Sequence, residues 1–102
     1  MQKFRRYKID NGLFEYLAKR YVLEFTNNNV IKLMKVNPIE EKDVYIVWIC
    51  KTLQNNKALL STTLDDGMYY EVTYNGDKQE LYFDAYEKVH NEAIPMIDKN
   101  TK

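Results

Sequence analysis

The apolar residues in the first third of the chain recur at helical spacing. They begin after Asp10-Asn11-Gly12 and follow one another every three or four positions as far as Phe25. Asp10 can start a helix, because its short side chain accepts hydrogen bonds from the first unpaired backbone amides. Glu15 and Lys19 lie four residues apart on the opposite side, in the favourable order for an ion pair. The pattern predicts an amphipathic helix from about residue 11 to 27, with an apolar face of Leu13, Phe14, Leu17, Tyr21, Val22 and Phe25.

The segment after this helix is ambiguous. Thr26-Asn27-Asn28-Asn29 weakens the helix, because asparagine side chains compete for hydrogen bonds with their own backbone. Val30–Val36 either prolongs the helix or forms a short extended piece, and its pattern does not decide between the two. Asn37-Pro38 marks a break, since proline disfavours helical backbone at the residue before it. We therefore expect a helical region over residues 11–35.

From Val44 onward, the β-branched and aromatic residues that are typical of strands dominate. Short turns containing asparagine, aspartate or glycine separate four such segments, and turns of this length join antiparallel neighbours. The predicted strands are Val44–Thr52, Lys57–Leu64, Met68–Tyr74 and Gln79–Ala85. We expect a single α+β domain over residues 1–102: a four-stranded antiparallel β-meander (44–85) with the N-terminal amphipathic helix on one face, a basic arm (1–10) and a short C-terminal helical tail (86–102) that Pro95 limits.

Turns at Asn55-Asn56, Asp65-Asp66-Gly67 and Asn75-Gly76 would sort alternate residues onto two faces of this sheet. The face expected to receive the helix is apolar and consists of Tyr45, Val47, Ile49, Leu60, Leu64, Met68, Tyr70, Val72, Leu81, Phe83 and Ala85. The opposite face mixes rings, hydroxyls and carboxylates and consists of Trp48, Cys50, Thr52, Leu59, Ser61, Thr63, Tyr69, Glu71, Thr73, Glu80, Tyr82 and Asp84. Because aromatic rings dominate contact energies at interfaces, this second face resembles a recognition patch. Coverage by the C-terminal segment and pairing of two copies across this face are the alternatives.

The charge of the chain is balanced overall but divided unevenly. Its 15 Lys and Arg equal its 15 Asp and Glu, so no global field attracts nucleic acid or a membrane. Residues 1–51 hold ten basic and six acidic side chains, whereas residues 52–102 hold five and nine. The N-terminal excess corresponds to Lys3, Arg5, Arg6 and Lys8. This arm is a candidate nucleic-acid-binding element, although basic termini are also common solubilising features.

The sequence offers little for catalysis, and we expect no enzyme, no cofactor and no metal site. A single cysteine and a single histidine exclude an internal disulfide and argue against structural zinc. We expect Cys50, in mid-strand, to be a small buried thiol and His90, in the tail, to be solvated. Phosphate-binding glycine loops and the common hydrolase motifs are absent from the sequence. No apolar run reaches the ~18 residues of a membrane span, so we expect a soluble chain from a reducing compartment and no membrane partner.

The segments KTLQNNKALLST, DGMYYEVTYNGDK and LYFDAY lie in one unbroken block, residues 44–86. This block resembles an uncharacterised domain family of small proteins from phages and prophages of Gram-positive bacteria. The resemblance implies a phage accessory protein in the cytoplasm of an infected bacterial host, and it brings no catalytic residues. Small phage proteins of this type commonly bind and block a host protein, often an immune effector such as a CRISPR nuclease. The resemblance therefore implies an anti-defence inhibitor.

We expect the chain to bind and inhibit a host protein through Trp48, Tyr69, Glu71, Tyr82 and Asp84. The rings would provide the buried area, and the carboxylates would suit a basic partner surface, including one that normally holds nucleic acid. Two alternatives stay open: a small nucleic-acid-binding protein that uses the basic arm, and a homodimeric scaffold protein. Stacking of nucleic acid on the ring-bearing face is less favoured, because Glu71, Glu80 and Asp84 would repel phosphates.

Overall fold

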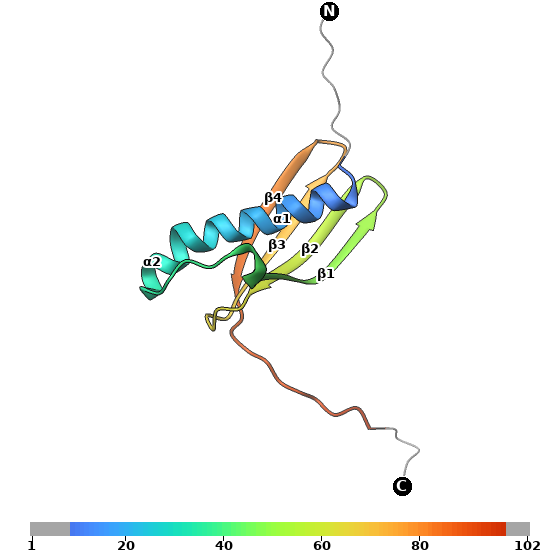
Figure 1. Cartoon of the computed structure of the whole chain (residues 1–102). Helices are drawn as coiled ribbons and strands as arrows, with labels where there is room; N and C mark the ends of the chain where they lie inside the picture. Colours follow the sequence, from blue (N-terminus) through green and yellow to red (C-terminus); the bar gives the residue numbers. More distant parts are fainter. Residues whose placement is uncertain (1–8, 98–102) are drawn as a thin grey trace, which may run out of the picture.

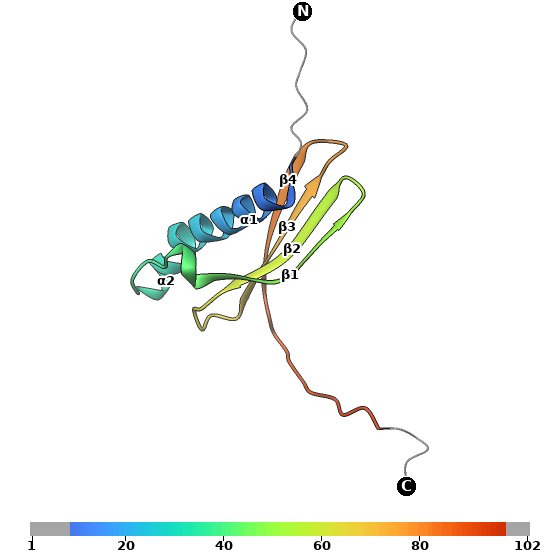
Figure 2. The ribbon, with the colours of Figure 1, turned by 45° about the vertical axis from the view of Figure 1, so that its right-hand side comes forward.

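The structure is a computed structural model that describes residues 9–97. A long helical segment lies across one side of a four-stranded sheet and leaves the other side uncovered (Figures 1 and 2). The helical segment comprises helix α1 (Asn11–Phe25), a π-helical turn (Thr26–Val30) and helix α2 (Ile31–Met34). A 3₁₀ turn (Glu41–Asp43) leads into strands β1 (Val44–Thr52), β2 (Asn55–Thr62), β3 (Met68–Asn75) and β4 (Glu80–Glu87). The prediction of an N-terminal helix with a four-stranded antiparallel sheet is confirmed.

Helix α1 begins where the sequence predicts. Asp10 is its N-cap residue, and the Oδ1 atom accepts the backbone N–H of Leu13 at 2.7 Å. Phe14, Ala18 and Val22 are fully buried, because a spacing of four residues places them on one side of the helix. The ambiguous segment 30–36 is helical as far as Met34, after which Lys35 ends the helix in the left-handed conformation.

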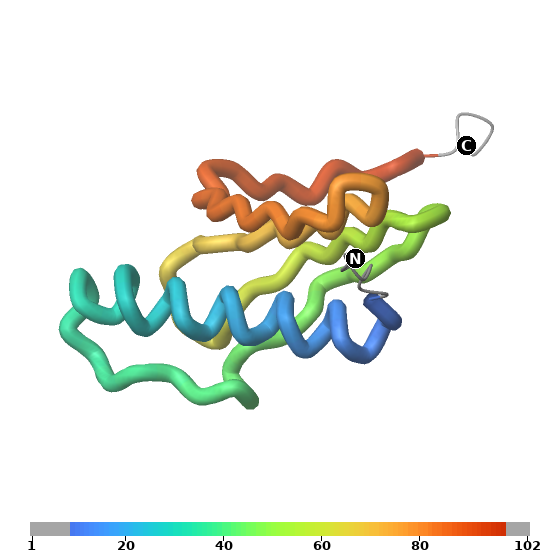
Figure 3. Tube along the Cα trace, turned by 90° about the horizontal axis from the view of Figure 1, so that it is seen from above, coloured from blue at the N-terminus to red at the C-terminus, as the bar shows by residue number. Residues whose placement is uncertain are grey.

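The asparagine run changes the pitch of the helix instead of ending it. After α1 the backbone widens into the π-helical turn, and the side chain of Asn27 points to the connection that leads to β1. Its Oδ1 atom accepts the Ile39 N–H at 2.9 Å, and its Nδ2 atom donates to the Ile39 oxygen at 3.1 Å. This pair of bonds fixes the connection where it runs back along the helix (Figure 3). Asn27 therefore provides both hydrogen bonds that the buried Ile39 backbone needs.

Each strand pairs antiparallel with the strand that follows it, in the order β1-β2-β3-β4. Residues opposite one another share a face of the sheet, so the register shows which side chains point to α1. Two successive rows on the helix side consist of Ile46, Leu60, Tyr70 and Ala85, and of Ile49, Ala58, Val72 and Phe83. Strand β1 carries a bulge at Val47, where the pairing shifts between Ile46 and Trp48. The extra residue reverses the alternation of side chains in the first part of β1.

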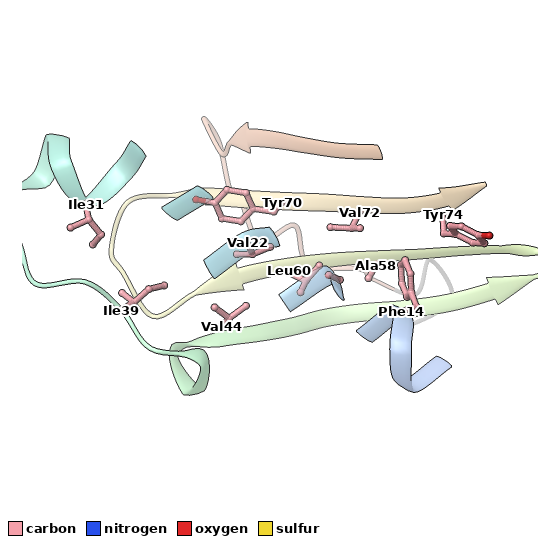
Figure 4. Close-up of a cluster of buried hydrophobic side chains, with 11 residues drawn as sticks. Phe14, Val22, Ile31, Ile39, Val44, Ala58, Leu60, Tyr70, Val72 and Tyr74 are labelled. Atoms are coloured by element: carbon pink, nitrogen blue, oxygen red, sulfur yellow. The ribbon is translucent and has the colours of Figure 1, made fainter. Parts of the chain in front are cut away.

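The core lies between α1 and these rows (Figure 4). Its largest side chains without exposed surface include Phe14, Val22, Leu60, Tyr70 and Val72. Phe25, Tyr70 and Phe83 form an aromatic cluster with ring centroids 5.4–5.7 Å apart. The Tyr70 hydroxyl accepts a hydrogen bond from Thr26 Oγ1 at 3.4 Å, which gives two buried polar atoms a partner. Burial raises the pKa of the Tyr70 phenol, because the apolar surroundings disfavour its anion.

The predicted position of the first turn is wrong. The turn lies at Leu53 and Gln54, and β2 already begins at Asn55. Tertiary contacts hold the two asparagines in the strand: Asn55 Oδ1 accepts the Gly76 N–H at 3.0 Å, and the buried Asn56 lies with its Nδ2 atom 3.2 Å from Asn11 Oδ1. Leu53 adopts the positive φ of the turn, 57°, that asparagine would take more easily.

The predicted helical tail is wrong for residues 88–97, which contain neither helix nor strand. Strand β4 continues to Glu87, and the Lys88 N–H then donates to the Gly67 oxygen at 2.8 Å. This bond keeps the chain extended as it passes the β2–β3 connection and leaves the sheet (Figure 1). Within the described residues no surface packs against the tail, so nothing stabilises an isolated helical turn there. The last five residues of the predicted tail, 98–102, lie outside the described residues.

We predict that Gly76→Ala destabilises the fold by about 1–3 kcal/mol. A Cβ atom at Gly76 would overlap with the backbone oxygen and Cβ of Gln54, where the β1–β2 and β3–β4 turns lie against each other. Gly12→Ala is the matched control, because a Cβ there meets only Asp10 Oδ1 at 3.5 Å, and in a helix it should stabilise by about 0.4–1 kcal/mol. Urea denaturation of both variants checks the two signs, and equal free energies of unfolding would contradict the close approach of the turns.

We predict that Asn27→Ala lowers the free energy of unfolding by about 1–3 kcal/mol, because the buried Ile39 backbone loses both partners. The exposed neighbour Asn28 provides the control: Asn28→Ala should stay within about 0.5 kcal/mol of the unmodified chain. Thermal and urea denaturation measure the difference. Similar stabilities for the two variants would show that the two hydrogen bonds between Asn27 and the Ile39 backbone do not form in solution.

Candidate functional site

The side of the sheet turned away from α1 carries the binding residues predicted from the sequence, and we call it the open face. No described helix or loop covers it (Figure 2). Pairing of the strands places there Tyr45, Trp48, Cys50 and Thr52 from β1, Asn55, Lys57, Leu59 and Ser61 from β2, Tyr69, Glu71, Thr73 and Asn75 from β3, and Glu80, Tyr82, Asp84 and Tyr86 from β4. One face of the sheet is thus buried in the core while the other carries a mixed surface of rings and polar groups.

The five predicted residues all lie on this face, in neighbouring rows. Trp48 shares a row with Leu59, Glu71 and Asp84, so it lies three strands away from Asp84, a distance of about 14 Å. Glu71 and Asp84 are directly opposite each other on β3 and β4. Tyr82 lies in the next row, opposite Thr73. The face is therefore wide enough for contacts to be spread over all four strands.

Two of the three predicted rings are exposed on this face. Trp48 is 42% exposed and Tyr82 is 40% exposed, although both lie within strands. Tyr69 is less accessible: the Lys88 ammonium lies 5.2 Å from the centre of its ring, and its Nζ atom is 3.4 Å from the phenol oxygen. Tyr45, on β1, and Tyr86, opposite Tyr69, add two rings to the three that the sequence pattern singled out. Tyr86 was missed because the fourth strand was predicted to end at Ala85, whereas β4 continues to Glu87.

The open face is less acidic than the sequence suggests. Lys57, on β2, places its Nζ atom 3.4 Å from Glu71 Oε2, so one of the predicted carboxylates already has a cation. Lys88 brings a second positive charge through its position on Tyr69. Asp84 has no ion-pair partner among the described residues. The surplus of negative charge is therefore small and lies toward β4.

Tyr82 is tied to its own strand by a hydrogen bond. Its phenol donates to the carboxylate of Glu80, two residues earlier on the same side of β4. The pKa of Tyr82 is raised, first because loss of the proton would break this bond, and further because burial and the Glu80 charge both disfavour the anion. The bond directs the phenol along β4 toward Glu80 and keeps its hydroxyl as a donor to that carboxylate.

Three residues on and around this face lie elsewhere than the sequence predicted, and a fourth, Cys50, lies on the predicted face but differs in its burial. Tyr45 lies on the open face, opposite Ser61, and not under the helix. Val47 occupies the bulge and is exposed. Both errors arise because the bulge breaks the strict alternation expected for β1. Cys50 is exposed, not buried as expected, because nothing in the described chain covers its side of the sheet. Thr63, predicted for this face, lies beyond the end of β2.

Other candidate groups do not join this surface. The basic arm residues Lys3, Arg5, Arg6 and Lys8 lie outside the described residues. His90, in the tail, is exposed and lies 3.1 Å from Glu92 Oε1. Within residues 9–97 no group of three or more His, Cys, Asp or Glu side chains is arranged to hold a metal ion. Among the described helices, none has the length and apolar character needed to cross a membrane.

A family of unknown function, DUF6275, matches residues 15–96, from the first turns of α1 to the extended tail. The chain belongs to this family. The DUF6275 region therefore covers the whole sheet and is wider than the block 44–86 that carries the resemblance seen in the sequence. No curated protein and no solved structure gave a significant match to the chain.

We predict that Glu80→Gln lowers the pKa of Tyr82 toward its ordinary value, because the acceptor then carries no charge. A tyrosine-selective NMR titration follows the phenol directly. Glu87→Gln is the control, since Glu87 lies on the same strand and does not bond to Tyr82. A Tyr82 titration that does not respond to Glu80→Gln would contradict the hydrogen bond on the open face.

Proposed function

We propose that this DUF6275 chain is a binding protein that recognises a partner protein through the open face. The observation that carries the proposal is the exposure of Trp48 and Tyr82 on the side of the sheet that does not pack against α1. A solvated sheet face usually presents short polar and charged side chains, because burying rings is favourable and exposing them is not. Rings held on a rigid sheet offer contact area without a large loss of side-chain freedom.

The charges on this face favour a basic contact on the partner. Glu71 and Asp84 lie opposite each other, and two like charges at that position disfavour the paired strands. Lys57 relieves the repulsion on the Glu71 side only. A lysine or arginine of the partner next to Asp84 would neutralise the remaining carboxylate charge, and Tyr82 nearby would provide an aromatic contact for it. This is the chemistry expected for a protein surface that is itself basic.

The family resemblance gives the proposal its biological setting. In that setting the chain is a phage accessory protein in the cytoplasm of an infected Gram-positive host. Its partner is a host protein, and binding inhibits it; a nucleic-acid-binding immune effector, as in anti-CRISPR inhibition, would present the required basic surface. Inhibition needs no catalytic group on this chain, since occupation of the partner's surface is sufficient. The open face, with its rings and its acidic edge, is consistent with such a stoichiometric inhibitor.

The test is affinity capture from a Gram-positive host lysate with the full chain, followed by mass spectrometry and binding measurements with the purified partner. The Trp48→Ala/Tyr82→Ala double variant should lose the partner, with a decrease in affinity of at least about tenfold per ring. Tyr16→Ala is the matched control, because Tyr16 is an exposed tyrosine of α1, on the other side of the sheet. It should capture the partner as the unmodified chain does, and circular dichroism should show all three proteins folded.

Two outcomes would contradict the proposal. If the double variant still binds the partner with unchanged affinity, the open face is not the binding surface. If capture disappears after nuclease treatment of the lysate and after deletion of residues 1–8, the chain binds nucleic acid through its basic arm. That alternative also predicts a steep loss of affinity as salt is raised.

A further inference from the structure

The tail exposes an apolar segment that has no partner in the described chain. Its run Ala93-Ile94-Pro95-Met96-Ile97 contains no polar side chain. Ile94 is 70% exposed, Met96 93% and Ile97 80%. Several consecutive exposed apolar residues are unfavourable in water unless they serve a contact. The segment therefore has the properties of an unoccupied half of an interface.

A second apolar feature, which no described residue fills, lies on the helix side of the sheet, at the other end of β4. It is a groove of about 320 Å³ between the first turns of α1 and the β3–β4 hairpin. One wall is formed by Leu13, Leu17 and Tyr21 of α1, and the other by Tyr74 and Leu81, with Ile9 and Gln79 at its end. Leu13 and Tyr21 are 38% and 48% exposed, so the helix wall is open to solvent. The groove lies on the side opposite the open face and is independent of it.

The shape of the groove suits this segment. In an extended chain, alternate side chains point in opposite directions, so Ile94 and Met96 project to one side and Pro95 and Ile97 to the other. A segment that is apolar on both sides needs two apolar walls, and a groove between a helix and a sheet provides them. Specificity in such docking comes from pockets that receive alternate side chains.

The direction of the tail places this segment away from its own groove. The tail continues in the direction of β4 and leaves the sheet at the end opposite the β3–β4 turn (Figures 1 and 2). The groove lies at that turn, since Tyr74, Gln79 and Leu81 line it. From Lys88 to Ile94 an extended chain covers about 20 Å. The apolar run is therefore held clear of the body, where a neighbouring molecule can receive it.

We propose that the apolar tail of one copy docks in the groove of a second copy, and that the second copy returns its tail in the same way. Every chain carries both a tail and a groove, so reciprocal exchange forms a closed two-fold dimer that needs no other protein. The DUF6275 match extends through Met96, so the tail belongs to the same family region as the groove residues Leu17, Tyr21, Tyr74 and Leu81. This dimer does not depend on the partner protein proposed above.

The experiment measures the mass of the full chain by light scattering and sedimentation over a wide range of concentration. We expect a dimer for the unmodified chain and monomers for two variants, Ile94→Asp/Met96→Asp in the tail and Leu13→Asp in the groove. Neither should unfold: the tail has no described packing, and aspartate is favourable in the first turn of a helix. Leu33→Asp, at an 84% exposed position of α2, is the control and should stay dimeric.

A labelled peptide of residues 88–97 provides a direct measurement of docking. It should bind to the tail variant, whose groove is intact, and not to a chain that carries the tail and groove substitutions together. An unmodified chain that is monomeric throughout would overturn the proposal, whether or not the peptide binds. A dimer that survives both variants would also overturn it. Dissociation of that dimer by Trp48→Ala/Tyr82→Ala would then assign the contact to the open face.

Discussion

Burial of one stripe of α1 against β2 and β3 determines the rest of this molecule. Phe14, Ala18 and Val22 meet the sheet side chains Leu60 and Val72, and none of these five retains exposed surface. Residues 9–97 provide a single helical layer, so they cover only one side of the sheet and leave the other facing outward. The mixed open face and the groove beside α1 both follow from this single-sided packing. The helix covers the centre of the sheet and leaves the part of β4 beside it accessible.

The local sequence pattern was sufficient to predict the helix and the four strands, and to assign most side chains to the correct face of the sheet. Helical spacing located α1, and β-branched runs located all four strands, with β1 correct at both ends. The first turn was wrong, because tertiary contacts of Asn55 and Asn56 outweigh their preference for turns. The predicted faces of the sheet are nevertheless largely correct. A turn at Asn55-Asn56 would pair Thr52 with Leu59, whereas Thr52 pairs with Asn55, a shift of four residues. An even shift leaves each side chain on the same side of the sheet.

The features that the sequence could not provide are those that depend on distant residues. The bulge at Val47 reverses Tyr45, and no local signal such as a glycine marks it. The five candidate residues of the open face were placed on one side correctly by alternation. The ion pair between Lys57 and Glu71 depends on the pairing of β2 with β3, and the position of Lys88 on Tyr69 depends on the path of the chain after β4. Predicting the charge of a sheet face therefore requires the strand register, whereas predicting the face on which a side chain lies requires only the alternation.

The two proposed surfaces differ in what they can do together. The groove lies on the helix side and the open face on the other, so an exchange of tails leaves Trp48 and Tyr82 accessible in both copies. Such a dimer would present two open faces, and a partner with repeated sites would be held by both. Lys88 connects the open face to the tail, because it lies on the Tyr69 ring and begins the tail. Tyr69 is consequently the ring whose access depends on the path of the tail, whereas Trp48 and Tyr82 stay accessible whether or not the tail is docked.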